Sequence, residues 1–318
     1  MNEYIKRLQA QLFANPLILQ YLFDRGLTEQ TIREFGIGFA LDKEHETKQL
    51  TLNHDHTEKH LEYGNLGYHK ENVVATFTNR IMIPIHDSKG KPVGFTGRTI
   101  QGINNKYLTP YLQGWNNYLT QNDISLAKYK NTKETIHFKK GDILFNSHRV
   151  QSKYTWIVEA QLSSIGVYQT VNKNVMAIGG RILTDTHIEY LLEHGIKYVC
   201  QALDNDNAGL SAMYINAKKL ANANITNKVV IFREKFDPMD YIASNLQDEL
   251  YQILTNPHEG IDYMVRYFNQ EYANKSKFKY LLEVKKFFET VNVGHTLIEN
   301  PEPQTLGWFI NRHIGGQK

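Results

Sequence analysis

The chain has 318 residues, of which 41% are hydrophobic and 22% are charged, and its formal net charge at pH 7 is +3. This is the composition of an ordinary globular protein, and it excludes collagen-like, low-complexity and wholly disordered chains. The length allows one large domain or two to three smaller ones.

The sequence carries no feature of a membrane or secreted protein. No apolar run approaches the roughly 18 residues that a membrane span needs. The N-terminal stretch contains Glu3 and Pro16, which argue against a signal peptide. The single cysteine, Cys200, cannot form an internal disulfide or a four-cysteine zinc site. We therefore expect a cytoplasmic protein that binds no zinc and has no membrane partner.

Charge is distributed unevenly along the chain. Residues 79–106 hold five basic residues against one acidic residue, and residues 128–140 hold five lysines against one glutamate. Residues 156–240 are nearly balanced, with 8 basic and 9 acidic residues. A solvated surface would explain either basic run alone. Their separation from the acidic part predicts that one part of the chain binds a polyanion and another binds a metal ion.

The first 150 residues show an irregular mixture of helical and strand patterns, which predicts an α+β unit. The expected elements are helices over 2–14 and 28–35, strands over 81–87 and 91–100 with a turn at 88–90, and polar loops or insertions over 41–75 and 107–136.

From residue 154 onward, short apolar runs alternate regularly with helical patterns. The expected strands cover 154–158, 174–180, 197–203 and 228–232, and the expected helices cover 162–171, 186–195, 209–223 and 238–254. Such alternation with short connections predicts a parallel sheet with helices on both faces. After residue 258 the pattern is helical and ends in a tail that contains proline.

Acidic residues follow the expected strands of this sheet. Glu159 follows the first strand, Asp204 and Asp206 follow the third, and Asp237 follows the fourth. The carboxyl ends of parallel strands are where open α/β sheets bind ligands. Clustered carboxylates stay ionised together only when a cation neutralises them, and Mg²⁺ prefers oxygen ligands. A helix cap would explain the Asp204–Asp206 pair alone, but it does not explain acids at three strand ends.

Four segments resemble the Toprim domain, a module shared by primases, topoisomerases and some nucleases. They are, in order, IVEAQLSSIGV (157–167), AIGGRILT (177–184), ALDNDNAGLSA (202–212) and FDPMDYI (236–242). The resemblance implies a Rossmann-like parallel sheet. It also implies that Glu159 is a metal ligand or proton-transfer group and that Asp204 and Asp206 hold a divalent metal.

The segments upstream of these resemble the bacterial DnaG-type primase in particular. They are LFDRGLTEQTIREFGIGFA (22–40), NRIMIPIHDSKGKPVGFTGRTI (79–100), KYLTP (106–110) and FKKGDILFN (138–146). The resemblance covers roughly residues 15–250. It implies that Asp237 is a further metal ligand. It also implies a groove for template, primer and nucleotide phosphates, lined by Arg80, Arg98, Lys106 and Lys140.

The sequence departs from the family pattern in several places. Ser163 stands where the glutamate motif usually ends in an acid, and Met239 stands where a second acid often occurs, although Asp240 is adjacent. These changes bear on the number and affinity of the metal ions. We expect no counterpart of the family's N-terminal zinc-binding domain and only a shortened C-terminal helicase-binding domain, and therefore a compact, phage-like version.

These observations together predict the catalytic core of a DNA primase, a nucleotidyltransferase. The predicted parts are a basic N-terminal domain (1–150), a Toprim metal-binding domain (151–250) and a helical C-terminal region (251–318). The expected cofactor is Mg²⁺ or Mn²⁺. The expected partners are a single-stranded DNA template, ribonucleoside triphosphates, the replicative helicase and a separate zinc-domain protein acting in trans.

Two other functions use the same features. A Toprim nuclease would use the same acids to cut a strand instead of joining nucleotides. A non-catalytic protein that binds single-stranded DNA would keep the basic groove with a degraded metal site, and Ser163 favours this alternative while the intact Asp204–Asp206 pair opposes it.

Overall fold

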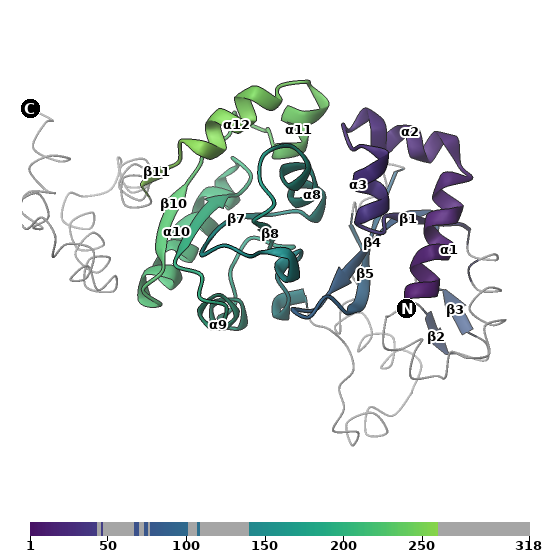
Figure 1. Ribbon diagram of the computed structural model, residues 1–318, viewed down its shortest axis with the longest axis horizontal. Coiled ribbons are helices and arrows are strands. Elements are labelled where there is room, and N and C mark those ends of the chain that lie inside the picture. The colour runs from purple at the N-terminus through teal and green to yellow at the C-terminus, as the bar shows by residue number, and fades with distance from the viewer. Residues whose placement is uncertain are drawn as a thin grey trace, which may run out of the picture.

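The computed structural model describes residues 1–42, 46, 67–69, 73–75, 77–100, 107–108 and 140–259. Two units stand side by side, and Figure 1 shows the N-terminal unit (1–108) at the right and a parallel-sheet unit (140–259) at the left. Within these residues, no helix has both the length and the apolar character to cross a bilayer. The region beyond 259, where a helical tail is expected, lies outside the described residues.

The N-terminal unit is built on an antiparallel sheet of strand order β1-β4-β5-β6. Its helices are α1 (Asn2–Phe13), α2 (Pro16–Asp24) and α3 (Glu29–Glu34). The sheet strands are β1 (Gly38–Ala40), β4 (Arg80–His86), β5 (Pro92–Thr99) and β6 (Tyr107–Leu108), and β2 (Gly67–His69) pairs separately with β3 (Val73–Ala75). The expected helices over 2–14 and 28–35 and strands over 81–87 and 91–100 are confirmed within one or two residues.

Two features of this unit differ from the sequence expectation. Helix α2 was not expected, although Pro16 lies at its first position, where a missing N–H costs nothing. Strands β2 and β3 lie within 41–75, where loops or insertions were expected. That region was expected to lack strands because few of its residues alternate between apolar and polar.

A buried carboxylate ties α1 to the end of β1. Glu46 is fully buried and accepts hydrogen bonds from Arg7 Nη2 at 2.8 Å and from Gln11 Nε2 at 3.1 Å. It also accepts one from the backbone N–H of Leu41 at 3.0 Å. These partners compensate the desolvation of the charge, so Glu46 acts as a structural anchor of the N-terminal unit.

The second unit contains a sheet of order β11-β10-β9-β7-β8, in which β10, β9, β7 and β8 are parallel. The edge strand β11 (His258–Glu259) is antiparallel to β10. The strands are β7 (Tyr154–Val158), β8 (Val175–Ala177), β9 (Tyr198–Ala202) and β10 (Thr226–Val229). The helices are α8 (Gln161–Thr170), α9 (Asp185–Glu193), α10 (Asn207–Asn222), α11 (Pro238–Ala243) and α12 (Gln247–Thr255), preceded by the short turns η1 (Lys140–Asp142) and η2 (Ser147–Arg149).

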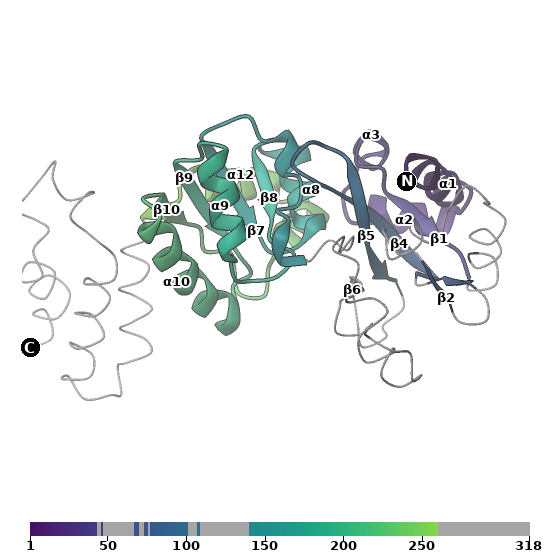
Figure 2. The same ribbon diagram turned by 90° about the horizontal axis from the view of Figure 1, so that it is seen from below.

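The expected parallel sheet with helices on both faces is confirmed. Trp156 and Val158 of β7 pack into one core with α8, α11 and α12, whereas Ile157 packs into a second core with α9 and α10. Figure 2 shows α9 and α10 in front of the sheet and α8 and α12 behind it. Burial on both faces explains why β7 and β8 are rich in apolar residues. The strand expected over 228–232 is instead β10, which begins at Thr226, ends at Val229 and is mostly polar and part-buried.

The single helix expected over 238–254 is wrong, because two helices replace it. Helix α11 ends at Ala243, and Asn245 adopts the left-handed conformation with φ of 57°. The N–H of Leu246 donates to the carbonyl of Tyr241, which closes the helix with the bond typical of a left-handed terminus. Asparagine tolerates this conformation better than most residues, so it is a weaker signal than glycine.

Direct contacts join the two units. Gln169 of α8 accepts a hydrogen bond from the N–H of Thr28 at 2.8 Å and donates to the carbonyl of Gly26 at 2.9 Å. The ring of Phe35 meets that of Tyr168 edge to face, with centroids 4.9 Å apart. One continuous hydrophobic cluster contains residues from both units. The surface between the units is therefore held by packing and by hydrogen bonds.

Candidate active site

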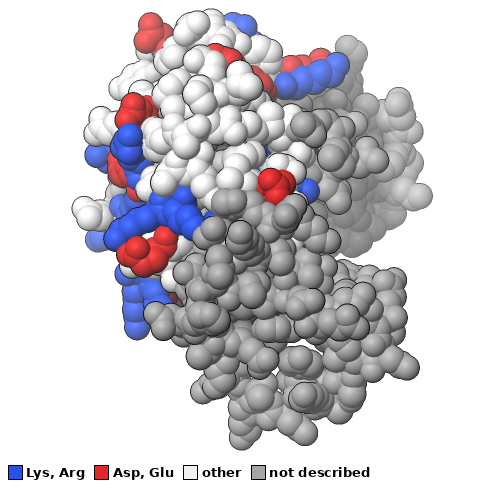
Figure 3. All heavy atoms as spheres, turned by 90° about the vertical axis from the view of Figure 1, so that its right-hand side faces the viewer, with Lys and Arg blue, Asp and Glu red and all other residues white. Residues whose placement is uncertain are grey.

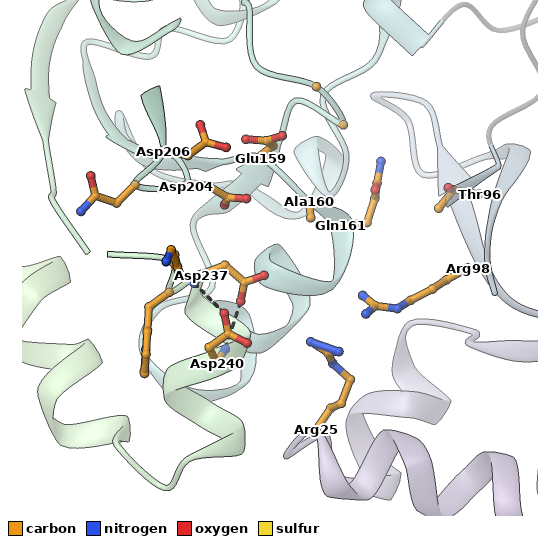
Figure 4. Close-up of a pocket in the computed structure, with 15 residues that line it drawn as sticks. Arg25, Thr96, Arg98, Glu159, Ala160, Gln161, Asp204, Asp206, Asp237 and Asp240 are labelled. Atoms are coloured by element: carbon orange, nitrogen blue, oxygen red, sulfur yellow. Dashed lines mark hydrogen bonds between the residues drawn. The ribbon is translucent and has the colours of Figure 1, made fainter. Parts of the chain in front are cut away.

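A cavity of about 500 Å³ lies between the two units. Figure 4 shows carboxylates on the side of the parallel sheet and arginine side chains reaching toward them from the N-terminal unit. The lining residues are Glu159, Asp204, Asp206, Asp237, Asp240, Ala160, Gln161, Gly179, Gly180, Asn205, Lys235 and Phe236 on one side, and Arg25, Thr96 and Arg98 on the other. The cavity thus presents negative and positive walls to the same space.

The parallel strands bring the predicted acids together. Glu159 follows β7, and Asp204 and Asp206 follow β9, which pairs with β7 in the sheet. The turn after β9 is tight, because a Cβ at Gly209 would lie 2.1 Å from the carbonyl oxygen of Asp204. Asp206 caps α10 by accepting a hydrogen bond from the Gly209 N–H at 2.6 Å. The capping role considered for this pair is therefore real, and it leaves the second oxygen of Asp206 facing an arginine.

Asp237 reaches the cavity from the start of α11. It accepts a hydrogen bond from the Asp240 N–H at 3.0 Å, and the Asp240 carboxylate accepts one from the Asp237 N–H at 2.9 Å. This reciprocal capping box fixes both side chains (Figure 4). Burial, followed by the charge of Asp240, raises the pKa of Asp237.

The surroundings of the Asp204 carboxyl disfavour its negative charge. Its pKa is raised to about 7, first by burial and then by the negative charges of three neighbouring carboxylates. Ionised Asp204 is therefore costly at neutral pH unless a cation compensates it.

Arg181 supplies one such cation. Its Nε lies 3.1 Å and 3.2 Å from the two oxygens of Glu159, and its Nη2 lies 3.0 Å from Oδ2 of Asp206. The guanidinium thus connects an acid that follows β7 with an acid that follows β9. Burial lowers the pKa of Arg181, but the charges and hydrogen bonds of these carboxylates outweigh it and raise the pKa.

The donor chemistry of this wall fits a divalent cation, because carboxylate oxygens are the ligands that Mg²⁺ prefers. In the described part of the chain, however, no three His, Cys, Asp or Glu side chains lie close enough together to hold a metal ion. Glu159 and Asp206 bind Arg181 instead. A metal ion would therefore require these carboxylates to exchange the arginine for the ion.

The comparisons with known proteins agree with this arrangement of two units. The family described as "DNA primase catalytic core, N-terminal domain" matches residues 4–111, and the family described as "Toprim-like" matches residues 156–242. The two matches follow one another along the chain, so residues 4–111 and 156–242 together resemble a DnaG-type primase catalytic core.

Relatives of this primase-type core come from several bacteria. The DNA primase of Helicobacter pylori strain J99 is 29% identical over 272 residues, which cover 83% of this chain and 44% of the relative. The DNA primase of Rickettsia prowazekii is 32% identical over 252 residues, which cover 73% of this chain and 37% of the relative. The chain spans about half the length, or less, of these curated relatives.

The solved structures show the same fold at low sequence identity. The Aquifex aeolicus primase, solved with its zinc-binding and RNA polymerase domains, has a TM-score of 0.71 and 23% identity, covering 94% of this chain and 68% of that chain. A DnaG primase catalytic domain bound to single-stranded DNA has a TM-score of 0.71 and 18% identity, with 91% of each chain covered. The fold of the core is therefore shared well beyond the sequence similarity.

The predicted basic residues of the primase-type core are found in different places. Arg98 lines the cavity, whereas Arg80 donates a hydrogen bond to the Gly97 carbonyl at 3.2 Å and is not a lining residue. Lys106 lies outside the described residues, and Lys140 begins η1 without a described side chain. Figure 3, viewed from the side of the N-terminal unit, shows basic and acidic side chains beside one another among the residues it colours. This outer face is therefore not a uniform basic patch.

Two arginines were not predicted from the sequence: Arg25 lines the cavity, and Arg181 contacts two of the acids that line it. Arg25 follows α2 and precedes Gly26, whose φ of 82° marks a sharp helix end. It lies within the segment 22–40 that carries the family resemblance, so that segment was an available signal. Arg181 lies within 177–184, but no feature of a lone arginine in a loop shows that it binds two acids.

The departures at positions 163 and 239 have a structural counterpart. Ser163 and Met239 are each 1% exposed, and neither lines the cavity. Met239 packs against α8 so closely that a Cβ at Gly166 would lie 2.5 Å from its Sδ. An apolar side chain at 239 thus joins α11 to α8, and the adjacent Asp240 reaches the cavity instead.

Proposed function

We propose that this chain is the catalytic core of a DNA primase, which joins ribonucleotides into short RNA primers on single-stranded DNA. The observation that carries the proposal is the cavity in which strand-end carboxylates face Arg25 and Arg98 of the other unit. Phosphoryl transfer needs both metal ligands and cationic groups that position phosphates. Carboxylates that could hold a metal ion and arginines that could hold phosphates both line this cavity.

The acidic wall would provide the metal site. Glu159, Asp204, Asp206 and Asp237 would hold Mg²⁺ or Mn²⁺, since a Toprim domain is a module that generally binds divalent metals. Such an ion would neutralise the triphosphate, polarise the attacked phosphorus and lower the pKa of the attacking 3′-hydroxyl. The elevated pKa of Asp204 supports this role, because the buried carboxyl has most to gain from a cation.

The arginine wall would position the phosphates. Arg98 is only 6% exposed as a residue and stands on β5, so the sheet fixes its direction. Arg25 lines the same cavity as Asp237, and its charge partly offsets the rise in the Asp237 pKa that burial and the charge of Asp240 cause. A planar guanidinium offers paired donors that suit phosphate oxygens. Arg80, Lys106 and Lys140 would continue this binding surface along the template.

The substrates and partners follow from the same reaction. The template would be single-stranded DNA, as in the related catalytic domain solved with that ligand, and the second substrate would be a ribonucleoside triphosphate. The replicative helicase would deliver the template in the cytoplasm. A separate zinc-domain protein would assist the start of primers.

The proposal is tested by incubating the protein with single-stranded DNA, labelled ribonucleotides and Mg²⁺ or Mn²⁺. RNA products that depend on template and metal, and that disappear in Asp206→Asn, would support it. The matched control is Lys219→Gln, which removes the Lys219–Asp185 ion pair at the surface. Metal-dependent nicking of DNA without RNA products would instead indicate a Toprim nuclease, and DNA binding without either reaction would indicate a non-catalytic protein.

A further inference from the structure

The position of Arg181 points to a function beyond a structural ion pair. The residue lies in the loop between β8 and α9, and its guanidinium contacts the two acids that a metal ion would need. The side chains of Glu159, Arg181 and Asp206 are 19%, 40% and 50% exposed. Both acids line the cavity, and Arg181 lies beside it without being a lining residue. These two ion pairs are therefore part-buried, and they are weak enough to be exchanged for another partner.

The backbone beneath Arg181 is fixed. The Asn216 side chain is fully buried, donates to the carbonyl of Arg181 at 2.8 Å and accepts from the N–H of Leu183 at 2.8 Å. The N–H of Gly179 donates to the carbonyl of Glu159 at 2.9 Å. Only the side chain of Arg181 is therefore left to change partners, while its backbone stays beside the acidic wall.

We propose that Arg181 is a resident counter-cation of the acidic wall, and that it exchanges with the divalent metal when a nucleotide arrives. Without metal, the guanidinium offsets the negative charges of Glu159 and Asp206, which it contacts at 3.1 Å and 3.0 Å. When metal binds Glu159 and Asp206, the arginine loses both partners. A triphosphate in the cavity then offers it new oxygen acceptors. This last step rests on the proposed function.

The exchange has two measurable consequences. The guanidinium competes with the metal, so it weakens metal binding when no phosphate is present. Because the phosphate stabilises the displaced arginine, nucleotide strengthens metal binding in the wild-type protein. This coupling is reciprocal, so metal must strengthen nucleotide binding by the same factor.

The first measurement is the affinity of Mn²⁺ for the nucleotide-free protein, followed by electron paramagnetic resonance and calorimetry. Arg181→Gln should bind Mn²⁺ about fivefold more tightly than wild type, since the arginine makes two part-exposed ion pairs that are each worth at most a few-fold in affinity. Arg181→Lys should fall between them, because a lysine cannot contact both acids with a planar fork. Lys219→Gln should match wild type. Unchanged or weaker Mn²⁺ binding in Arg181→Gln would overturn the proposal.

The second measurement repeats the titration at buffered free Mn²⁺ with a non-hydrolysable ribonucleoside triphosphate. Nucleotide should increase the Mn²⁺ affinity of wild type by a factor about five times larger than that of Arg181→Gln. Equal coupling in the two proteins would overturn the exchange. Thermal unfolding in chelator checks the fold, and Arg181→Gln should unfold at a lower temperature than wild type until Mn²⁺ is added.

These measurements separate the inference from the proposed function. If the arginine exchange is wrong but the function is right, the protein makes primers while wild type and the Arg181 variants bind Mn²⁺ with equal affinity. If the function is wrong, primers are absent while the Mn²⁺ titrations still report whether Arg181 competes with the ion.

Discussion

The parallel-sheet unit and the N-terminal unit place their functional side chains by different means. In the parallel-sheet unit, Glu159 and Asp204 follow neighbouring strands, so the sheet itself brings them to one edge. In the N-terminal unit, Arg25 follows a short helix and Arg98 stands within a strand. These arginines reach the acids only because the two units pack together. The position of an acid at a strand end can therefore be predicted from its neighbours in the chain. The position of the arginines depends on packing between two units that are far apart in the sequence.

The largest expected effect concerns the anchor that holds the N-terminal unit together. Replacing the fully buried Glu46 with Ala removes the acceptor of Arg7, Gln11 and the Leu41 N–H and leaves the part-buried Arg7 without this partner. We expect a loss of about 3–5 kcal/mol in the free energy of unfolding, measured with urea. The exposed Glu3→Gln should change it by less than about 0.5 kcal/mol. A tolerated Glu46→Ala would show that this carboxylate is not the anchor.

The stability of the parallel-sheet unit should depend on pH because this unit buries a neutral histidine, His187. Burial lowers the pKa of His187 to about 4, below the value of 6.5 expected in the unfolded chain. The unfolded state therefore binds the proton first, so stability falls as the pH decreases from about 6.5 to 4. The free energy of unfolding that is lost over this pH range because of His187 should be on the order of 2–3 kcal/mol.

The measurement is thermal and urea unfolding across this pH range, with His187→Gln for comparison. Glutamine can keep the capping box at the third position of α9 but does not titrate. The variant should lose part of the acid sensitivity. The same pH profile in both proteins would show that His187 is not responsible for it.

The contacts between the two units should contribute a smaller effect. Gln169→Ala removes the hydrogen bonds to the Thr28 N–H and the Gly26 carbonyl, which should cost about 1–2 kcal/mol. Hydrogen exchange of α3 should then accelerate more than that of α10. Gln20→Ala, which breaks only the bond from Gln20 to Asp24 on α2, is the matched control. Equal exchange in all three proteins would mean that the units do not depend on this contact.

The smallest expected effect is on the salt dependence of DNA binding. Each phosphate contact on single-stranded DNA contributes about −0.7 to the slope of log affinity against log salt, so four contacts from Arg80, Arg98, Lys106 and Lys140 would give about −3. Arg98→Gln should flatten the slope by about 0.7. Lys173→Gln, which changes a residue away from the cavity, should leave it unchanged. Identical slopes for the Arg98 variant and wild type would place the DNA elsewhere.

The sequence predicted the parallel sheet well because its signals are local. The apolar runs, the cap at Thr184 and the acids that follow β7 and β9 all depend on neighbours in the chain. From them, the common position of Glu159, Asp204 and Asp206 could be expected, and the cavity confirms that they share one wall. Their roles as metal ligands stay predictions.

The arginines were harder to place because their environment is set by tertiary contacts. Arg80 and Arg98 carry similar sequence signals, yet one binds the Gly97 carbonyl and the other lines the cavity. Arg181 gave no signal at all, since its partners come from two other strand ends. The break between α11 and α12 was missed for a related reason, because Asn245 marks a helix end less clearly than glycine does.

Parallel kinetics of Asp204→Asn and Arg98→Gln test most directly the claim that the two walls form one active site with separate roles. Primer synthesis and DNA affinity would be measured for both variants. Asp204→Asn should lower kcat by about 100-fold or more while template affinity stays unchanged, because the acid acts on the reacting phosphate. Arg98→Gln should mainly weaken binding of template or nucleotide, by about tenfold. Primer synthesis at the wild-type rate by Asp204→Asn would contradict the account.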